Sequence, residues 1–180
     1  MKNISRITIF IIVGSFVGCY GDAIYSNYLF EQYCNEEGRT GQFIYERVGL
    51  GDEYFIPIPK DPRKANFHFI VDDNFMMNKS LLEKDYVFSK YSEAILLSTI
   101  GPITSRETSV TRRSDNKVLG KSVSLSNRQG WLARRNILGQ NQSDRCPRGY
   151  DKNTDMSEDS VLHATLITNI FYRNKHKGVK

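Results

Sequence analysis

The sequence 105-SRETSVTRRSDNKVLGKSVSL-125 holds two runs rich in Thr, Ser and Val, with polar residues between them. The residues at 114–116, Ser-Asp-Asn, favour turns because their short side chains hydrogen-bond the local backbone. Two β-prone runs around such a turn are typical of an antiparallel hairpin, although the stronger Asn-Gly signal is absent. We therefore expect strands over residues 105–112 and 117–125.

Further extended segments are expected on the N-terminal side of this hairpin. Residues 42–48 and 66–72 alternate in side-chain character, as strands with one buried face do. Residues 53–58 form an extended piece that ends at prolines, and residues 93–100 form an apolar run that stops at Gly-Pro. Residues 49–52 read as a turn. Together with the hairpin, these segments predict an antiparallel sheet of four to six strands.

Three segments have helical patterns. Residues 21–37 carry an apolar stripe and end at Gly38, and residues 78–86 form a shorter candidate. In residues 161–172 the cap-like Ser-Glu-Asp at 157–159 favours a helix, although alternation at every second residue also fits a strand. The fold class predicted is α+β, with N-terminal and C-terminal helices packed on the antiparallel sheet.

The N-terminal sequence MKNISRITIFIIVGSFVGC has the three-part pattern of an export signal. A short positive front precedes an apolar run from Ile7 to Val17, which is shorter than the roughly 20 residues of a membrane span. A small residue directly before Cys19 resembles the bacterial lipobox, in which the cysteine is acylated and becomes the new N-terminus. We therefore expect a signal peptide over residues 1–18 and a single α+β domain over residues 19–180.

Acylation of Cys19 predicts a membrane partner, held through the N-terminal lipid. By analogy with the sorting of such lipoproteins, Tyr20 after the cysteine favours the outer membrane, with the domain facing the periplasm. Anchoring at the inner membrane, or secretion without lipid, is the alternative. Export also disfavours nucleic acid as a partner, and a composition near the globular average argues against general disorder.

Two further cysteines, Cys34 and Cys146, remain once Cys19 is set aside. An even number of cysteines in an exported chain favours a disulfide. The sequence contains no Cys-x-x-Cys and no Cys/His cluster with zinc spacing. A bridge between Cys34 and Cys146 is therefore the simplest pairing, and two unrelated buried thiols are the alternative.

Several short features occur together with the signal that ends at a cysteine. They are Cys34, Gly41 with Ile44-Tyr45 and Val48, the turn Asp115-Asn116-Lys117-Val118-Leu119, Gly130-Trp131-Leu132, and Cys146-Pro147. This combination resembles a loose group of small, uncharacterised bacterial lipoproteins over most of the mature chain. The resemblance implies a lipid-anchored envelope protein, supports the disulfide, and carries no activity.

The sequence contains no phosphate-binding loop, zinc-protease motif or nucleophile elbow. His68 and His163 lie in apolar segments, where a hydrogen-bonded structural histidine is expected rather than a ligand or base. The Asp-Asp-Asn at 72–74 lacks the spaced acids of a calcium loop and reads as a turn. We therefore predict no catalytic residue, no metal site and no cofactor.

Three functional classes remain. The favoured one is a lipid-anchored envelope protein with an accessory or binding role. The second is an envelope enzyme without a recognisable motif, which needs a deep pocket where His68, Asp72 or Asp73 meets Ser or Thr hydroxyls. The third is a secreted or inner-membrane interaction protein, of the inhibitor or immunity type.

Charge is distributed unevenly along the chain. Residues 106–148 contain ten basic and three acidic residues, whereas residues 22–61 contain eight acidic and three basic ones. Such asymmetry can attract an anionic partner, here anionic lipid, lipopolysaccharide or acidic glycan. The alternative is that the two regions neutralise each other within the fold or form solvated faces. The residues of this predicted basic patch are Arg106, Arg112, Arg113, Lys117, Lys121, Arg128, Arg134 and Arg135.

Overall fold

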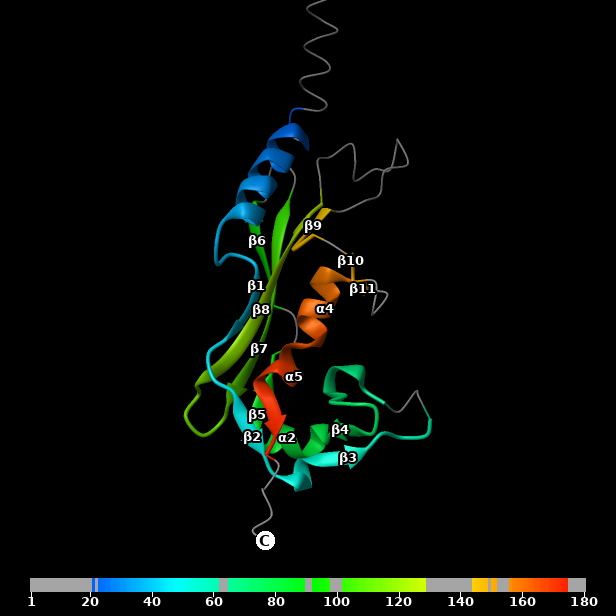
Figure 1. Cartoon of the computed structure of the whole chain (residues 1–180). Helices are drawn as coiled ribbons and strands as arrows, with labels where there is room; N and C mark the ends of the chain where they lie inside the picture. Colours follow the sequence, from blue (N-terminus) through cyan, green and yellow to red (C-terminus); the bar gives the residue numbers. More distant parts are fainter. Residues whose placement is uncertain are drawn as a thin grey trace, which may run out of the picture. The chain divides into compact units, whose positions relative to one another are not determined.

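The computed structural model describes residues 21, 23–61, 65–89, 92–97, 102–128, 144–148, 150–151 and 156–174. These residues form helices and a mostly antiparallel sheet, so the predicted α+β class is confirmed (Figure 1). The chain divides into two compact units. Unit 1 takes its residues from 1–40, 93–106 and 124–147, and unit 2 takes its residues from 41–92, 107–123 and 148–180. The single domain expected over residues 19–180 stays a prediction.

The predicted hairpin is present as β7 (Ile103–Arg112) and β8 (Val118–Asn127), which are hydrogen-bonded neighbours. The backbone N–H of Arg112 donates to the carbonyl of Lys117 at 2.9 Å and closes the hairpin. Asn116 has a φ of 55°, a left-handed conformation that asparagine adopts more readily than most residues. The polar turn residues therefore specify this connection.

β7 and β8 are the centre of a six-stranded sheet with the order β1-β8-β7-β5, in which β6 also pairs with β7 and β9 with β8. The pairings of β1 with β8, β5 with β7, and β9 with β8 are antiparallel. The sheet lies within the predicted range of four to six strands. The strands around the hairpin are β1 (Gly41–Ile44), β5 (Tyr86–Phe88), β6 (Ser92–Leu97) and β9 (Asp144–Cys146).

The strand predicted over residues 42–48 is wrong beyond Ile44. The backbone N–H groups of Tyr45 and Glu46 both donate to the carbonyl of Leu119, at 2.8 and 3.0 Å. Two residues thus oppose one on the partner strand, which is the arrangement of a β-bulge and bends the chain away from its partner. The alternation of side chains continues through the bulge, so the pattern alone does not reveal it.

Beyond the bulge the chain forms β2 (Val48–Leu50), which pairs in parallel with β12 (Phe171–Arg173). The turn predicted over residues 49–52 is therefore wrong. Its first two residues belong to β2, and the 3-10 helix η1 begins at its last residue and covers Asp52–Tyr54.

The strand predicted over residues 66–72 is also wrong, because Asn66 redirects the backbone. Its side-chain oxygen accepts the N–H of His68 at 3.2 Å, and its carbonyl accepts the N–H of Phe69 at 2.9 Å. These local bonds form the 3-10 helix η3 (Phe67–Phe69) in place of a strand. Short polar side chains compete with sheet pairing in this way.

The short helix predicted over residues 78–86 is confirmed as α2 (Lys79–Asp85). Asn78 caps it, because its side-chain oxygen accepts a backbone N–H from the first turn. The strand before the helix, β4 (Phe75–Met77), was not predicted, and it pairs antiparallel with β3 (Phe55–Pro57). A further two-stranded sheet joins β10 (Tyr150–Asp151) and β11 (Met156–Ser157).

The helical interpretation of residues 161–172 holds for most of that segment. It contains most of α4 (Glu158–Ala164) and all of α5 (Leu166–Ile170), separated at Thr165. The strand alternative holds only from Phe171 onward, where the chain extends into β12. α4 and α5 both contact β1, so the C-terminal helices pack on the sheet as expected.

The core of unit 2 joins the sheet to α2, α5 and β12. Leu82, Leu119 and Ile170 are fully buried there, and Phe171 packs edge-on against Tyr86 with ring centroids 4.7 Å apart. Each such side chain contributes about 1.5–3 kcal/mol when it leaves water. The core therefore ties the C-terminal helices and strand to the sheet.

Unit 1 is held by the first helix, residues 23–35, which runs as expected from the apolar stripe. Phe30 is fully buried against Ile103 and Leu125 of the hairpin strands. On the same side the Ser26 hydroxyl donates to the side-chain oxygen of Asn127 at 2.8 Å. The Asn127 amide also donates to the side-chain oxygen of Asn27 at 2.7 Å, so the helix packs on β7 and β8 through both apolar and polar contacts.

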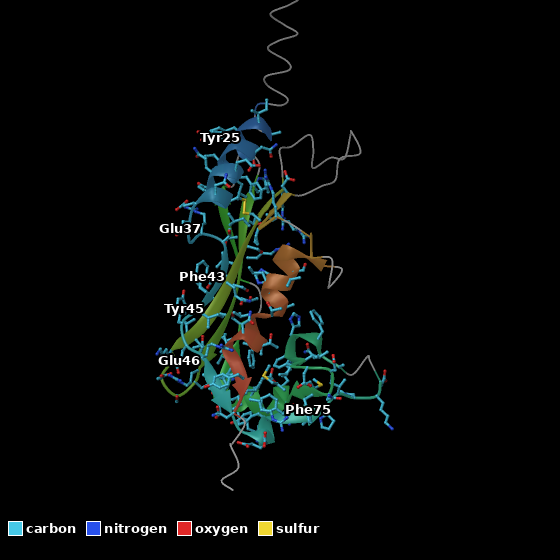
Figure 2. The ribbon with its side chains drawn as sticks, in the orientation of Figure 1. Tyr25, Glu37, Phe43, Tyr45, Glu46 and Phe75 are labelled. Atoms are coloured by element: carbon cyan, nitrogen blue, oxygen red, sulfur yellow. A yellow bond between two sulfur atoms is a disulfide. The ribbon has the colours of Figure 1, made fainter. Side chains whose placement is uncertain are left out.

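A disulfide joins Cys34, in the last turn of this helix, to Cys146 in β9, as predicted (Figure 2). Cys146 is buried in the same cluster as Phe30. The bridge closes a loop of 112 residues. Cross-links over such long loops restrict the unfolded chain most strongly in the chain-entropy model.

We expect Cys34→Ser to lower the free energy of unfolding by about 2–5 kcal/mol, because the unfolded chain regains the freedom that the bridge removes. Urea unfolding of oxidised wild type and variant measures the difference. Reduction of the wild type should shift its midpoint toward that of the variant, and reduction of the variant should change nothing. Free thiols at both positions in exported wild-type protein would contradict the prediction.

Candidate functional site

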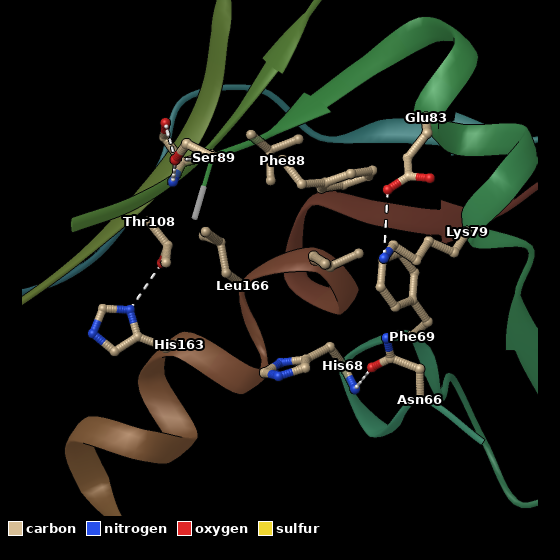
Figure 3. A pocket seen from close by; sticks show the side chains of 13 residues that line it. Asn66, His68, Phe69, Lys79, Glu83, Phe88, Ser89, Thr108, His163 and Leu166 are labelled. Atoms are coloured by element: carbon tan, nitrogen blue, oxygen red, sulfur yellow. Dashed lines mark hydrogen bonds and ion pairs between the residues drawn. The ribbon is translucent and has the colours of Figure 1, made fainter. Parts of the chain in front are cut away.

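Unit 2 contains a cavity of about 400 Å³ between η3, α2, β5, β7 and the C-terminal helices (Figure 3). One part of its wall is apolar and comes from Phe69, Phe88, Val110, Leu166 and Ile167. Small-molecule sites typically enclose about 300–1,000 Å³, with apolar walls and a few converging polar groups. The size and the apolar wall of this cavity are those of a small-molecule site.

The polar groups at one end of the cavity belong to a cluster around His163 of α4. The Nδ1 atom of His163 lies 2.8 Å from the hydroxyl of Thr108 and 2.6 Å from the hydroxyl of Ser122. The two hydroxyls, from neighbouring strands β7 and β8, are 2.6 Å apart. Ser122 and His163 are buried, and buried polar groups are normally satisfied by partners of this kind. The cluster confirms that His163 is a hydrogen-bonded structural histidine.

Only two members of this cluster, Thr108 and His163, line the cavity. Ser122 is fully buried, so a substrate in the cavity does not reach its hydroxyl. The only carboxylate among the described lining residues is Glu83, which is in an ion pair with Lys79 at 3.5 Å. A nucleophile needs exposure and a base that a third group orients. The arrangement therefore favours hydrogen bonding to a ligand over activation of a hydroxyl.

The opposite end of the cavity carries both charges of the Lys79–Glu83 pair (Figure 3). His68 of η3 also lines the cavity, with its ring centroid 4.0 Å from that of Phe67. Ser89 and Ser109 line it as well, with their hydroxyl oxygens 2.9 Å apart. The described lining is therefore polar at both ends and carries no unbalanced charge.

Of the three residues that the enzyme hypothesis named as alternatives, His68 lines this cavity, as do the Ser and Thr residues described above. Asp72 and Asp73 are not among its described lining residues. The side chain of Asp72 instead accepts the backbone N–H groups of Asn74 and Phe75, both at 2.8 Å. Residues 72–74 thus form the turn that was predicted.

Two cations of the predicted basic patch, Arg112 and Lys117, lie at the ends of the hairpin strands and are paired with acids. Arg112 contacts the carboxylates of Glu46 and Asp115 at 2.7 and 2.8 Å, and Lys117 contacts Glu46 at 2.7 Å (Figure 2). Glu46 belongs to the acid-rich segment and Arg112 and Lys117 to the basic one. These pairs favour the alternative in which the two regions neutralise each other.

The ion pairs shift the pKa values of both carboxyl groups downward. Hydrogen bonds from Arg112 and then Lys117 lower the pKa of Glu46. The Arg112 guanidinium, followed by the backbone N–H of Lys117, lowers the pKa of Asp115 to about 2. The Asp115 carboxylate therefore stays ionised to a lower pH than an ordinary aspartate, and the pKa of Glu46 is shifted in the same direction.

The other members of the basic patch are less concentrated. Lys121 pairs with Glu107 at 3.3 Å, and the Nε of Arg113 donates to the carbonyl of Glu83 at 3.1 Å. Arg112 and Arg113 also line a second hollow of about 450 Å³. Arg106 and Arg128 belong to unit 1. Four residues of interest, Cys19, Trp131, Arg134 and Arg135, lie outside the described residues.

No family model, curated protein or solved structure matches the chain. Among the described residues, no helix is both long and apolar enough to cross a membrane. The same residues contain no group of three or more His, Cys, Asp or Glu that could hold a metal ion.

Sequence reasoning identified His163 but missed Thr108 and Ser122 as its partners. They lie 55 and 41 residues from His163 in the chain. The pairing of β7 with β8 brings these two hydroxyls within 2.6 Å of each other. A histidine inside an apolar segment was the only signal that a polar partner had to be nearby.

Acidification should destabilise the hairpin end. A folded pKa of about 2 for Asp115, against an ordinary value of 3.8, gives stability that is present above pH 3.8 and lost as the pH falls toward 2. Glu46 acts in the same direction. In Glu46→Gln/Asp115→Asn the melting temperature should therefore fall less over this range than in wild type, as measured by circular dichroism. Asp73→Asn, on an exposed turn, should keep the wild-type decline, and an equal decline in all three proteins would refute the prediction.

Proposed function

We propose that this protein is a lipid-anchored protein of the bacterial cell envelope, facing the periplasm from the outer membrane, that binds a small uncharged molecule in the cavity of unit 2. The cavity, with its apolar wall and its Thr108–His163 end, carries the binding part of the proposal. The sequence pattern that ends at Cys19 carries the anchor.

The chemistry of the cavity wall defines the class of ligand. Its apolar part matches the body of a ring or short chain, because apolar surface gains free energy when it leaves water. Its uncharged polar groups are hydroxyls, imidazoles and the Asn66 amide, and the charges of Lys79 and Glu83 balance each other. A charged ligand would lose its hydration without a compensating partner charge, which is costly. The ligand is therefore an uncharged molecule with one hydroxyl or carbonyl group for the Thr108 end.

The disulfide supports the export that an anchor requires. Disulfides form and persist in oxidising compartments such as the bacterial periplasm and are rare in the cytosol. Cys34 and Cys146 are bonded in unit 1, and Cys146 is buried among apolar side chains. A stable bridge in this position is consistent with a protein that folds after export.

An anionic partner is the weaker candidate. Arg112, Lys117 and Lys121 already contact carboxylates of the same chain, which reduces the field that they present to a ligand. The hollow beside Arg112 and Arg113 is the feature that keeps a lipid head group, a lipopolysaccharide phosphate or an acidic glycan under consideration.

The anchor predicts the N-terminus of the mature protein. Protein isolated from membranes should begin at Cys19 and carry several acyl chains, since a single chain binds only marginally. Mass spectrometry of the N-terminal peptide measures this directly. Cys19→Ser should lose the acyl mass and the lipid-dependent membrane attachment. An unmodified N-terminus that begins elsewhere would refute the anchor.

The cavity predicts selective binding of uncharged ring compounds. Benzyl alcohol and benzene should both bind the full protein, and benzoate should not, as followed by NMR chemical shifts. Thr108→Val should weaken the binding of benzyl alcohol by about 3- to 10-fold, which corresponds to the loss of one net hydrogen bond. Its affinity for benzene should stay unchanged. Thr111→Val, the same change on β7 at a residue outside the described cavity lining, is the matched control. Loss of both ligands in the control, or binding of neither to wild type, would exclude the proposed site.

A further inference from the structure

The first helix has an exposed apolar and aromatic surface in its first two turns. Ile24, Tyr25 and Tyr28 are 69%, 48% and 59% exposed, and their spacing places them on one face. Tyr25 is labelled on this helix in Figure 2. Ser26 and Phe30 lie on another face, buried in unit 1. We refer to Ile24, Tyr25 and Tyr28 as the outer aromatic face.

The described residues of unit 1 do not account for the outer aromatic face. None of its three residues belongs to the described core clusters. The Gln32 side-chain amide, on the same helix, donates to the Tyr28 hydroxyl at 2.7 Å. Single exposed apolar residues are ordinary, whereas a group of them marks an interaction surface. Among the described residues, nothing in unit 1 is recorded as covering this surface, which leaves it open to an occupant.

We infer that the outer aromatic face rests on the surface of the bilayer in which Cys19 is anchored. This inference rests on the proposed acylation of Cys19. Ile24 follows Cys19 by five residues, so a fully extended chain separates them by at most about 18 Å. An acylated Cys19 would thus keep the first turns of the helix beside the lipid head groups.

The side chains of the outer aromatic face suit a lipid surface. Tyrosine has an apolar ring and a polar hydroxyl, and it is enriched where hydrocarbon meets head groups. Helices that lie in the interface bury their apolar face about 5–10 Å into this boundary. Ile24 adds apolar area beside the two rings. The helix is therefore bound through apolar and aromatic contacts.

The charges on the helix identify the lipid class. Asp22 is the only charged residue between positions 20 and 30, whereas Glu31 follows later in the helix and Glu36 and Glu37 come directly after its end. The absence of basic residues in this part of the sequence gives no attraction for anionic head groups. The outer aromatic face thus fits a zwitterionic surface and should bind it independently of salt, unlike the basic patch.

Hydroxyl-radical footprinting of the full acylated protein in phosphatidylcholine vesicles tests the inference. Tyr45 and Tyr172 serve as internal references, because their exposures of 57% and 42% match those of Tyr25 and Tyr28. A helix face open to water gives similar oxidation rates for both pairs. Docking on the bilayer should lower the oxidation rates of Tyr25 and Tyr28 by at least about threefold relative to those of the reference tyrosines. The protection should be equal at 0.1 and 1 M salt, where the Debye length falls from about 10 to about 3 Å.

A variant and a matched control locate the effect. Ile24→Glu puts a charge on the outer aromatic face and should return Tyr25 and Tyr28 to the reference rates. An acidic residue in the first turn interacts favourably with the helix dipole, so the unfolding midpoint of the variant should equal that of wild type. Val118→Glu, at a 39% exposed apolar residue of β8, should keep the protection.

The outcomes separate this inference from the anchor. Acylated Cys19 with equal rates for both tyrosine pairs would overturn the inference and leave the anchor standing. If Cys19 is not acylated, the anchor is refuted, and footprinting of the protein with added vesicles tests the docking of the outer aromatic face by itself. Slower oxidation of Tyr25 and Tyr28 than of the references would support the docking, and equal rates would overturn it. Protection that persists without vesicles and grows with protein concentration would identify a second copy of the chain as the occupant, which also overturns the inference.

Discussion

The pairing of β7 with β8 is the constraint on which the rest of the structure depends. All four other strands of the sheet pair with one of these two, and both units use parts of both strands. The hairpin supplies Ile103 and Leu125 to the core of unit 1, and Val110 and Leu119 to that of unit 2. Loss of this one ladder would therefore remove a wall from each core. The short turn between β7 and β8, with its local hydrogen bonds, fixes the register in which the two strands pair. The contacts of both cores, between residues far apart in the sequence, depend on this register.

Charge blocks in the sequence need not become charged surfaces, and Glu46 shows why. The bulge at Tyr45 and Glu46 ends the pairing of β1 with β8, and Glu46 lies where Arg112 and Lys117 both reach it. An acid from the N-terminal block thereby pairs with two bases of the later block, and Asp115 supplies the second carboxylate that balances their charge. Ion pairs of this kind at the surface add little stability, but they reduce the potential that a partner meets.

The elements that the sequence predicted well are those with local signals. The hairpin has its polar turn, and α2 has the cap at Asn78. The errors arose where a local bond or a distant partner overrode the pattern. Asn66 bends its segment into a 3-10 helix. β2 is a strand only because it pairs with β12, which lies near the other end of the chain. The cavity has the same origin, since no linear spacing relates Thr108 to His163. Only the folded sheet and α4 bring these two residues together.

The polar end of the cavity restricts what can bind there. Thr108, Ser122 and His163 already satisfy one another, so a ligand has to exchange these hydrogen bonds rather than complete an open set. An exchange of this kind is worth only about 0.5–1.5 kcal/mol net. Burial of apolar surface, at about 25 cal/mol per Å², gives more than this once some tens of Å² are covered. Affinity should therefore come mainly from the apolar body of the ligand against Phe88 and Leu166, while Thr108 fixes its orientation. Such a site discriminates by shape first and by hydrogen bonding second.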